Sequence, residues 1–241
     1  MTERQSLKGH VAVITGASHG IGLALAEALA REGCDLVVAA RKAASLTDAV
    51  RQLSLSKCQF NAIGCDVRSA ADVQNLFDTV RKRHSRLDIL INNAGVAHAL
   101  APVEELQLDA WKEVIDTNLT GTFLCTQAAL PLMHAGGTIV NNLSVAALQP
   151  FEGMAAYNAS KHGAMGFTNV LRQELRKKGI RVLALIPGAT DTAIWDQFWP
   201  DAPRERMLSP ATVAEAVVHV LTLPANATIE EIRLGPTAGV L

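Results

Sequence analysis

Tyr157 and Lys161 are the residues of this 241-residue chain whose types and spacing are best suited to acid–base chemistry. Tyr157 is the only tyrosine, and Lys161 follows four positions later in Tyr157-Asn-Ala-Ser-Lys161. Side chains four positions apart share one face of a helix. A cation beside a phenol favours the phenolate and lowers a pKa that is otherwise near ~10. The pair predicts a tyrosine that exchanges protons near neutral pH, although Tyr-x-x-x-Lys also occurs in helices by chance.

A glycine-rich turn near the N-terminus predicts a nucleotide site. An apolar run ends at Thr15, and a turn with three glycines follows before a helical pattern begins. Glycines at such a junction permit a tight turn and a close approach to phosphate, and the helix N-terminus attracts the pyrophosphate. The spacing is Gly-x-x-x-Gly-x-Gly, not the more common Gly-x-Gly-x-x-Gly. The predicted cofactor residues of the turn are Gly16, Ser18, His19, Gly20, Ile21 and Gly22.

The end of the second predicted strand, Ala40-Arg41, indicates which dinucleotide binds. A carboxylate at this point would bond the ribose hydroxyls and favour NAD, but no acid is present. The Arg41 guanidinium can instead form paired hydrogen bonds to a 2′-phosphate, with His19 in the glycine turn. We therefore predict a preference for NADP(H) over NAD(H).

Two further strand ends are predicted to receive the adenosine part of the cofactor. Asp66 and Val67 close the third strand, where an acid can bond the adenine edge. Asn93, Ala94 and Gly95 follow the fourth strand, and small residues there leave room for the ligand. Either group alone could be ordinary chemistry of a strand end.

Short apolar runs alternate with longer helix-like stretches along the whole chain, which predicts an α/β fold. The runs are mostly continuous, as expected for parallel strands covered on both faces. We therefore predict one Rossmann-type domain over residues 1–241, with a doubly wound seven-stranded parallel sheet. The expected strands are His10–Thr15, Asp35–Ala40, Gln59–Gly64, Leu87–Asn92, Gly137–Leu143, Ile180–Ile186 and Ile229–Leu234. The expected helices are Ile21–Glu32, Ala70–His84, Leu108–Met133, Ala155–Lys178 and Pro210–Leu223.

Composition excludes several function classes. The chain is 49% hydrophobic and 19% charged with a formal net charge of −1, so no basic field attracts nucleic acid or anionic membranes. No apolar run is long enough to span a membrane, and no signal-peptide stretch is present. The four cysteines and seven histidines lack metal-ligand spacing, so we expect reduced thiols, no catalytic metal and a cytoplasmic location.

Taken in order, these motifs resemble the short-chain dehydrogenase/reductase family of the classical type. The resemblance extends from Lys8 to Thr192, and it rests on the joint occurrence of short motifs at matching spacing. Besides the motifs above, it includes Asn118, Ser144 and the segment Pro187-Gly188 with Thr192. It implies a Rossmann fold, a nicotinamide cofactor and an oxidoreductase that interconverts a ketone and a secondary alcohol.

The resemblance also implies roles for individual residues. Tyr157 would be the general acid/base, and Ser144 would hydrogen-bond the substrate oxygen. Lys161 would bind the nicotinamide ribose and keep the phenol acidic, while Asn118 would position a water that links Lys161 to solvent. The nicotinamide pocket would be shaped by Pro187, Gly188, Thr190 and Thr192.

Several alternatives remain open at this point. The substrate could be a small or medium apolar ketone, a 3-oxoacyl group or a hydroxy acid, and a non-catalytic cofactor sensor or a lyase are competing functions. Residues 189–209 are expected to cover the substrate, where Trp195, Phe198 and Trp199 form either an apolar lid or a packing cluster. We expect a homodimer through the helices Leu108–Met133 and Ala155–Lys178, or a homotetramer.

Overall fold

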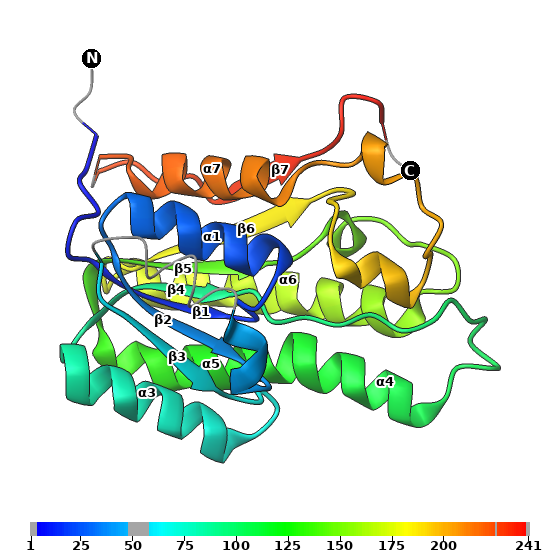
Figure 1. Cartoon of the computed structure of the whole chain (residues 1–241), viewed down its shortest axis with the longest axis horizontal. Helices are drawn as coiled ribbons and strands as arrows, with labels where there is room; N and C mark the ends of the chain where they lie inside the picture. Colours follow the sequence, from blue (N-terminus) through cyan, green and yellow to red (C-terminus); the bar gives the residue numbers. More distant parts are fainter. Residues whose placement is uncertain (1–3, 48–57, 225, 240–241) are drawn as a thin grey trace.

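The computed structural model describes residues 4–47, 58–224 and 226–239. Within them, seven parallel strands form one sheet in the order β3-β2-β1-β4-β5-β6-β7 (Figure 1). The strands are β1 (Val11–Thr15), β2 (Asp35–Ala40), β3 (Phe60–Gly64), β4 (Leu87–Asn92), β5 (Met133–Asn142), β6 (Arg181–Pro187) and β7 (Glu231–Leu234). The predicted doubly wound seven-stranded parallel sheet is confirmed.

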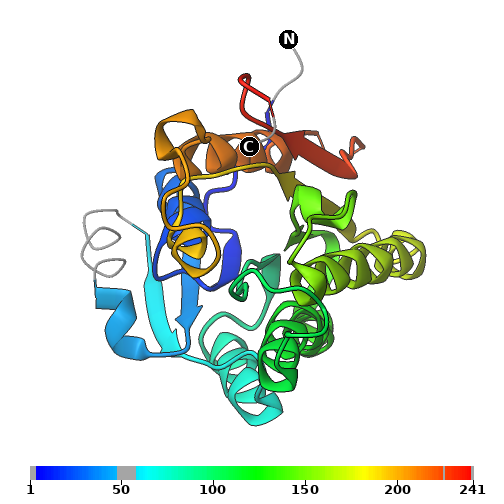
Figure 2. The same cartoon turned by 90° about the vertical axis from the view of Figure 1, so that its right-hand side faces the viewer.

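Helices cover both faces of the sheet (Figures 1 and 2). One face carries α1 (Gly20–Arg31) and α7 (Pro210–Leu221), which contact each other. The opposite face carries α3 (Ala70–His84), α4 (Leu108–Ile115), α5 (Gly121–Ala129) and α6 (Ala155–Arg176). Short 3-10 helices lie at Ala43–Leu46, Leu130–Leu132, Val145–Ala147, Ala193–Gln197 and Arg204–Arg206.

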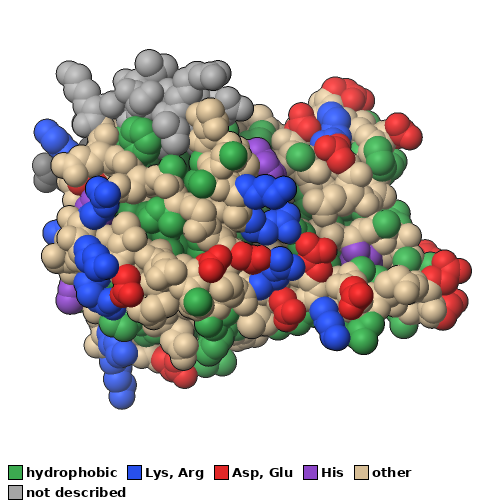
Figure 3. Space-filling model, turned by 60° about the horizontal axis from the view of Figure 1, so that its bottom comes forward, with side chains coloured by type: hydrophobic (Ala, Val, Ile, Leu, Met, Phe, Trp, Pro, Cys, Tyr) green, Lys and Arg blue, Asp and Glu red, His purple; other side chains and the backbone are tan. Residues whose placement is uncertain are grey.

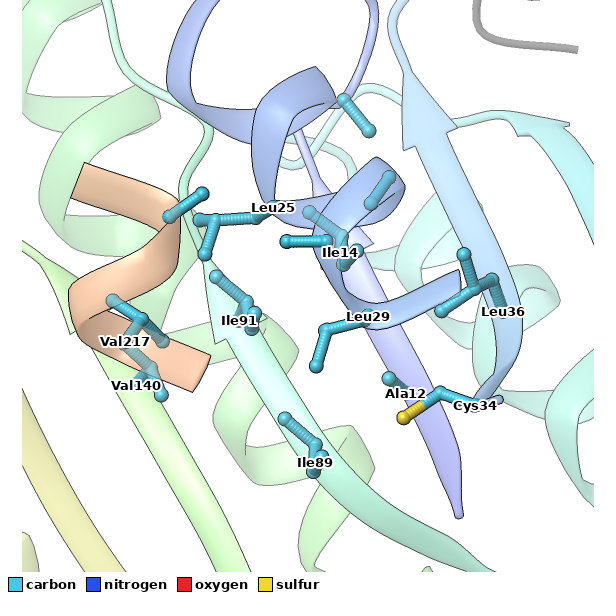
Figure 4. Close-up of a cluster of buried hydrophobic side chains, with 14 of the residues drawn as sticks. Ala12, Ile14, Leu25, Leu29, Cys34, Leu36, Ile89, Ile91, Val140 and Val217 are labelled. Atoms are coloured by element: carbon cyan, nitrogen blue, oxygen red, sulfur yellow. The ribbon is translucent and has the colours of Figure 1, made fainter. Parts of the chain in front are cut away.

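The strands β1, β2, β4 and β6 are buried on both faces, as their continuous apolar sequences predict, whereas the edge strands β3 and β7 are partly exposed. Alternate residues of β1 point into different cores: Ile14 joins the cluster under α1 and α7, and Val13 joins the cluster under α3, α5 and α6. Figure 4 shows the first cluster, in which Leu25 and Leu29 of α1 approach Ile14. This two-sided burial makes the sheet a rigid base for the residues at its edge.

Most predicted element ends lie within two residues of the observed ones. Gly33 and Gly179 follow the ends of α1 and α6, as predicted for helix stops. Ser209 caps α7 by accepting a hydrogen bond from the Thr212 backbone N–H at 3.1 Å, and Pro210 is the first helical residue.

The predicted helix Leu108–Met133 is the main departure from expectation. It is divided into α4, a π-helical turn at Asp116–Thr120, α5 and a 3-10 turn, and β5 already starts at Met133. A continuous helical pattern does not reveal such an insertion, because a π-turn adds a residue without ending the helix. Asn118 lies in this turn.

The carboxyl ends of all seven strands point the same way, toward the right-hand side of Figure 1. The direction of strand succession reverses between β1 and β4, and open α/β sheets bind ligands at such a switch point. The glycine turn follows β1, and residues 93–95 follow β4. The topology therefore brings the predicted nucleotide residues together.

Within the described residues, no helix has the length and apolarity that crossing a membrane requires.

Candidate active site

A cleft of about 1090 Å³ runs along the carboxyl edge of the sheet. It starts at the glycine turn, passes the ends of β2 and β3, and continues past Tyr157 to residues 189–209. Gly22 and Asn118 do not line it. All the other predicted site residues do: Gly16, Ser18, His19, Gly20, Ile21, Arg41, Asp66, Val67, Asn93, Ala94, Gly95, Ser144, Tyr157, Lys161, Pro187, Gly188, Thr190 and Thr192.

The glycine turn needs its glycines for two separate reasons. Gly16 has φ +64°, and a Cβ there would lie 2.7 Å from the Ala94 Cα, so both conformation and space exclude a side chain. Gly22 lies beneath the cleft, where a Cβ would be 2.3 Å from the Gly16 carbonyl oxygen. The turn thus leaves bare backbone ahead of α1, which fits a bound pyrophosphate.

Asn93 supports the glycine turn rather than only leaving space beside it. Its Nδ2 donates to the carbonyl oxygens of Thr15 and Gly16, both at 2.9 Å, and its backbone N–H donates to Thr15 Oγ1 at 3.0 Å. Asn142, at the end of β5, donates from Nδ2 to Asn93 Oδ1 at 2.8 Å. Asn142 is not among the predicted site residues, because only the pairing of β4 with β5 brings it to this position.

The Asp66 carboxylate is held by Arg68. Arg68 donates to it from the backbone N–H, Nε and Nη2, with distances of 2.6–3.1 Å. These hydrogen bonds to the guanidinium are the main reason why the pKa of Asp66 lies below its usual value. Asp66 lines the cleft as predicted, but both of its oxygens already have a partner.

Arg41 lines the cleft at the end of β2 and also has an acidic neighbour. Its Nη1 lies 3.3 Å from Glu113 Oε1 of α4, and Arg68 Nη1 lies 4.0 Å from the same oxygen. Lys42 also lines this part of the cleft. Figure 3 shows Lys and Arg side chains gathered near the centre of one face, with acidic side chains beside them. Neither Arg68 nor Glu113 was predicted, because their approach depends on how α4 packs against the sheet edge.

Ser144 and Tyr157 lie together in the cleft. Ser144 follows β5, and Tyr157 lies in the first turn of α6. Burial raises the pKa of Tyr157, and a hydrogen bond with the Ser144 side chain partly offsets this. The expectation that Lys161 would leave this pKa below its ordinary value is therefore wrong here, because desolvation of the phenol dominates.

Lys161 is buried, with 6% of its surface exposed. Its Nζ donates to the Asn142 carbonyl oxygen at 2.9 Å and lies 5.5 Å from the centre of the Tyr157 ring. Burial lowers the pKa of Lys161 to about 8, since it disfavours the charged form. The predicted sharing of one helix face by Tyr157 and Lys161 is confirmed.

Asn118 lies behind the cleft wall. Its Oδ1 accepts from the Val96 backbone N–H at 2.9 Å, and its Nδ2 donates to the Val96 carbonyl oxygen at 2.9 Å and to Ser160 Oγ at 3.0 Å. The residue therefore joins the π-turn, the loop after β4 and α6. The role in positioning water that the resemblance implies remains a prediction.

Residues after β6 form the other wall of the cleft. The Gly188 backbone N–H donates to the Leu234 carbonyl oxygen at 2.7 Å, which fixes Pro187-Gly188 beside β7. Thr190 is buried and donates from Oγ1 to the Gly188 carbonyl oxygen at 3.0 Å. Thr192 lies against the glycine turn, where a Cβ at Gly20 would be 3.0 Å from its Cγ2.

We call residues 189–209 the covering loop, and the two ends of this loop lie side by side. The Leu208 N–H donates to the Ala189 carbonyl oxygen and the Asp191 N–H donates to the Leu208 carbonyl oxygen, each at 2.9 Å. The Trp195 ring lies 4.9 Å from Phe198 and 6.0 Å from Trp199 between centroids, and all three rings line the cleft. The three aromatic residues therefore pack on one another and line the cleft, and their action as a lid over the substrate stays a prediction.

Among the described residues, no group of three His, Cys, Asp or Glu side chains could hold a metal ion. Cys34, Cys65 and Cys125 are buried, and burial is the main cause that raises the pKa of Cys34 and Cys65 to about 12. The lining of the cleft instead offers a phosphate cradle, a basic end and a Ser–Tyr–Lys group. This combination suits an organic, phosphate-bearing cofactor.

A model of the short chain dehydrogenase family matches residues 10–203. The chain belongs to the short-chain dehydrogenase/reductase family. It is 36% identical over 232 residues to the 3-oxoacyl-acyl-carrier-protein reductase of Synechocystis, covering 93% of this chain and 94% of that protein. It is 34% identical over 232 residues to an uncharacterized oxidoreductase of Staphylococcus aureus, covering 95% of this chain and 98% of that protein.

Solved structures of other family members show the same fold. A short chain dehydrogenase from Burkholderia cenocepacia in complex with NADP has a TM-score of 0.87 and 31% identity, covering 95% of this chain and 98% of that one. One from Burkholderia phymatum in complex with NAD has a TM-score of 0.83 and 28% identity, covering 90% and 86%. This short-chain dehydrogenase/reductase is therefore an oxidoreductase of the nicotinamide-cofactor type, and both forms of the cofactor occur among its relatives.

Proposed function

We propose that this enzyme interconverts a ketone and a secondary alcohol with Tyr157 as the general acid/base. The observation that carries the proposal is the convergence of Ser144, Tyr157 and Lys161 in the cleft that begins at the glycine turn. A nicotinamide cofactor, when bound, supplies or accepts the hydride. The residues of the chain then have to orient the carbonyl and move one proton.

Proton transfer is assigned to the Tyr157 hydroxyl. In the direction of reduction, the phenol donates its proton to the substrate oxygen while the carbonyl carbon gains the hydride. In oxidation, the phenolate accepts the alcohol proton. The Ser144 hydroxyl, which hydrogen-bonds Tyr157, orients the same substrate oxygen. The Lys161 ammonium lies close enough to the ring to stabilise the phenolate while it forms.

We further propose that NADP(H) is preferred over NAD(H). Arg41 lines the cleft at the end of β2, with Lys42 beside it, and position 40 is an alanine where an acid would select NAD. Both basic side chains line this end of the cleft and would attract a 2′-phosphate there, and the Arg41 fork suits an oxyanion. The glycine turn, which Asn93 supports, would bind the pyrophosphate.

We also propose that the enzyme is a cytoplasmic homodimer or a larger homo-oligomer. Support for assembly comes from exposed apolar side chains on α4, α5 and α6, where Leu108 is 62%, Phe123 42% and Val170 52% exposed. Three buried thiols, of Cys34, Cys65 and Cys125, suit a reducing compartment.

The variant Tyr157→Phe tests the acid/base assignment. It removes the hydroxyl and keeps the ring, so we expect turnover to fall by at least about 100-fold. Cofactor affinity should change little, because the glycine turn and Arg41 are untouched. Initial rates with ketones and NADPH, together with cofactor binding measured by fluorescence, give the two readouts. Turnover at a comparable rate in this variant would show that another group transfers the proton.

A further inference from the structure

The cleft continues beyond Ser144 and Tyr157 into a compartment with apolar walls. Three segments build it: the loop after β4, the loop after β5 and the covering loop. Figure 2, which looks onto the carboxyl edge of the sheet, shows these segments arranged around the strand ends. The apolar side chains that line it include Val96, Leu100, Phe151, Met154, Trp195 and Phe198.

Hydrogen bonds join these segments to one another. The Ala97 backbone N–H donates to Gln197 Oε1 of the covering loop at 2.9 Å. On the other side, the Ala101 backbone N–H donates to the Gly153 carbonyl oxygen at 3.1 Å. A substrate body bound between these walls would contact mainly apolar side chains.

Few charged side chains line this part of the cleft. Among the described lining residues beyond the nucleotide end, Glu152 is the only charged side chain other than Lys161. Lys161 is buried and already donates to the Asn142 carbonyl oxygen. No solvent-exposed cation among these lining residues is therefore placed to receive an anionic substrate.

The surroundings of the compartment are acidic as well. Arg204 of the covering loop is held by Asp191 at 3.1 Å and by Asp196 at 2.6 Å, which satisfies its charge. Asp201, Glu205 and Arg206 are also exposed on this loop, which therefore carries more acidic than basic side chains. Glu104 and Glu105 are exposed on the loop after β4, and Figure 3 shows acidic side chains at this end of the molecule.

We propose that the substrate is a carbonyl compound or alcohol with an apolar, ring-bearing body that carries either no charge or a positive charge. The inference rests on the ketone–alcohol activity proposed above. A carboxylate would be desolvated between apolar walls without a cationic partner, and Glu152 would repel it. An acyl group delivered by an acidic carrier protein would meet the same negative rim. Keto acids and carrier-bound 3-oxoacyl groups are thereby excluded from the substrate range that the sequence left open.

Three ketones of similar shape test this directly: an aryl methyl ketone, its para-carboxylate and its para-trimethylammonium analogue. We expect kcat/KM with NADPH to be at least about tenfold lower for the carboxylate than for the neutral ketone. The trimethylammonium compound should be reduced at least as well as the neutral one. Comparable or better reduction of the carboxylate would overturn the proposal.

Charge variants assign the effect to the compartment. Glu152→Lys should shift the ratio of kcat/KM for the carboxylate and trimethylammonium ketones toward the carboxylate, and Glu152→Gln should shift it less. Glu174→Lys makes the same charge change on an exposed part of α6 outside the cleft and should leave the ratio as in the wild type. If Glu152→Lys and Glu174→Lys shift this ratio equally, the cause is the overall charge of the protein, and a local role of Glu152 is contradicted.

A binding measurement separates this proposal from the proposed function. Trp195 and Trp199 line the compartment, whereas Trp111 lies on α4, so a Trp111→Phe background makes tryptophan fluorescence report on the compartment. With NADP⁺ present, we expect the neutral and trimethylammonium ketones to quench this fluorescence at lower concentrations than the carboxylate. If quenching follows that order but no ketone is reduced, the proposed reaction fails while the inferred ligand class stands. If the carboxylate quenches as effectively as the neutral ketone, the inferred ligand class fails.

Discussion

Different physical effects act on the charged and titratable side chains at the two ends of the cleft. At the nucleotide end, exposed arginines and acids form ion pairs, and such pairs contribute little stability but fix charge where a phosphate can reach it. At the reacting end, burial shifts the pKa of Tyr157 upward and that of Lys161 downward, so both groups are held closer to their neutral forms. The first arrangement suits recognition of an anion, and the second keeps the phenol protonated, which is the form that donates a proton to a carbonyl oxygen.

Cofactor choice is predicted to depend on Arg41. The variant Arg41→Asp removes a charge-assisted hydrogen bond to a 2′-phosphate and places a like charge near Glu113. We expect the affinity for NADPH to fall by about 10- to 100-fold while that for NADH holds or improves. Dissociation constants of both cofactors, measured side by side, give the ratio. Arg31→Asp, the same change in the last turn of α1, should not alter it, and an unchanged ratio in Arg41→Asp would refute the assignment.

The buried Lys161 predicts a pH dependence of stability. Its pKa is about 8 in the folded protein and near ~10.4 in the unfolded chain. Between these values the unfolded chain binds a proton that the folded protein has lost, so the free energy of unfolding rises with pH. From about pH 7 to about pH 9.5, this contribution is about 2 kcal/mol.

Urea unfolding of the wild type and of Lys161→Met, each at about pH 7 and about pH 9.5, measures this contribution. Between the two pH values, the free energy of unfolding should rise by about 2 kcal/mol more for the wild type than for the variant. Lys177→Met, at an exposed lysine, should follow the wild type. Parallel pH profiles for wild type and Lys161→Met would mean that the folded-state pKa is not depressed.

At the scale of elements, the helix α6 and the loop that precedes it form one positioning unit. Asn158, next to Tyr157 in α6, donates from Nδ2 to the carbonyl oxygens of Ala146 and Gln149 at 2.9 and 2.8 Å. Its Oδ1 accepts from the Phe151 backbone N–H at 3.1 Å. One side chain thus ties the segment between Ser144 and α6 to the helix that carries the phenol.

The variant Asn158→Ala is predicted to loosen this loop. Three hydrogen bonds to backbone are lost, at about 1 kcal/mol each. We expect lower kcat/KM for ketones and faster amide hydrogen exchange in residues 145–153, with cofactor affinity much less affected. Asn158→Asp keeps the acceptor for Phe151 and should give an intermediate exchange rate. Unchanged exchange in both variants would show that the loop is held by other contacts.

At the scale of the whole molecule, the helices on one face leave apolar side chains in contact with solvent. Phe123 of α5 packs edge-on against Phe167 of α6, with ring centres 6.1 Å apart, and Val170 continues the same face. A second copy of the chain can bury this face by two-fold symmetry.

Val170→Glu should therefore weaken self-association. The side chain is 52% exposed, so the substitution places a charge in the proposed contact without disturbing the fold. Light scattering coupled to size exclusion should show a smaller particle than for the wild type. Val103→Glu, at a position 74% exposed on the loop before α4, is the matched control and should keep the wild-type mass. A wild type that is already monomeric would rule out the proposed assembly.

The sequence by itself determined the order of the strands along the chain, the glycine turn and the shared face of Tyr157 and Lys161. These follow from local physics, because hydrophobic periodicity, helix stops and helical spacing act over a few residues. It could not place the π-turn at Asp116–Thr120, since one inserted residue shifts the apolar pattern by a single position without ending the helix.

Only the tertiary structure decided which groups meet across the sheet. The contacts of Asn142 with Asn93, Glu113 with Arg41 and Gln197 with Ala97 join segments between 49 and 100 positions apart. It also decided that burial, rather than the neighbouring lysine, sets the direction of the Tyr157 pKa shift. Desolvation depends on every element packed around a group, and no local pattern in the chain encodes that sum.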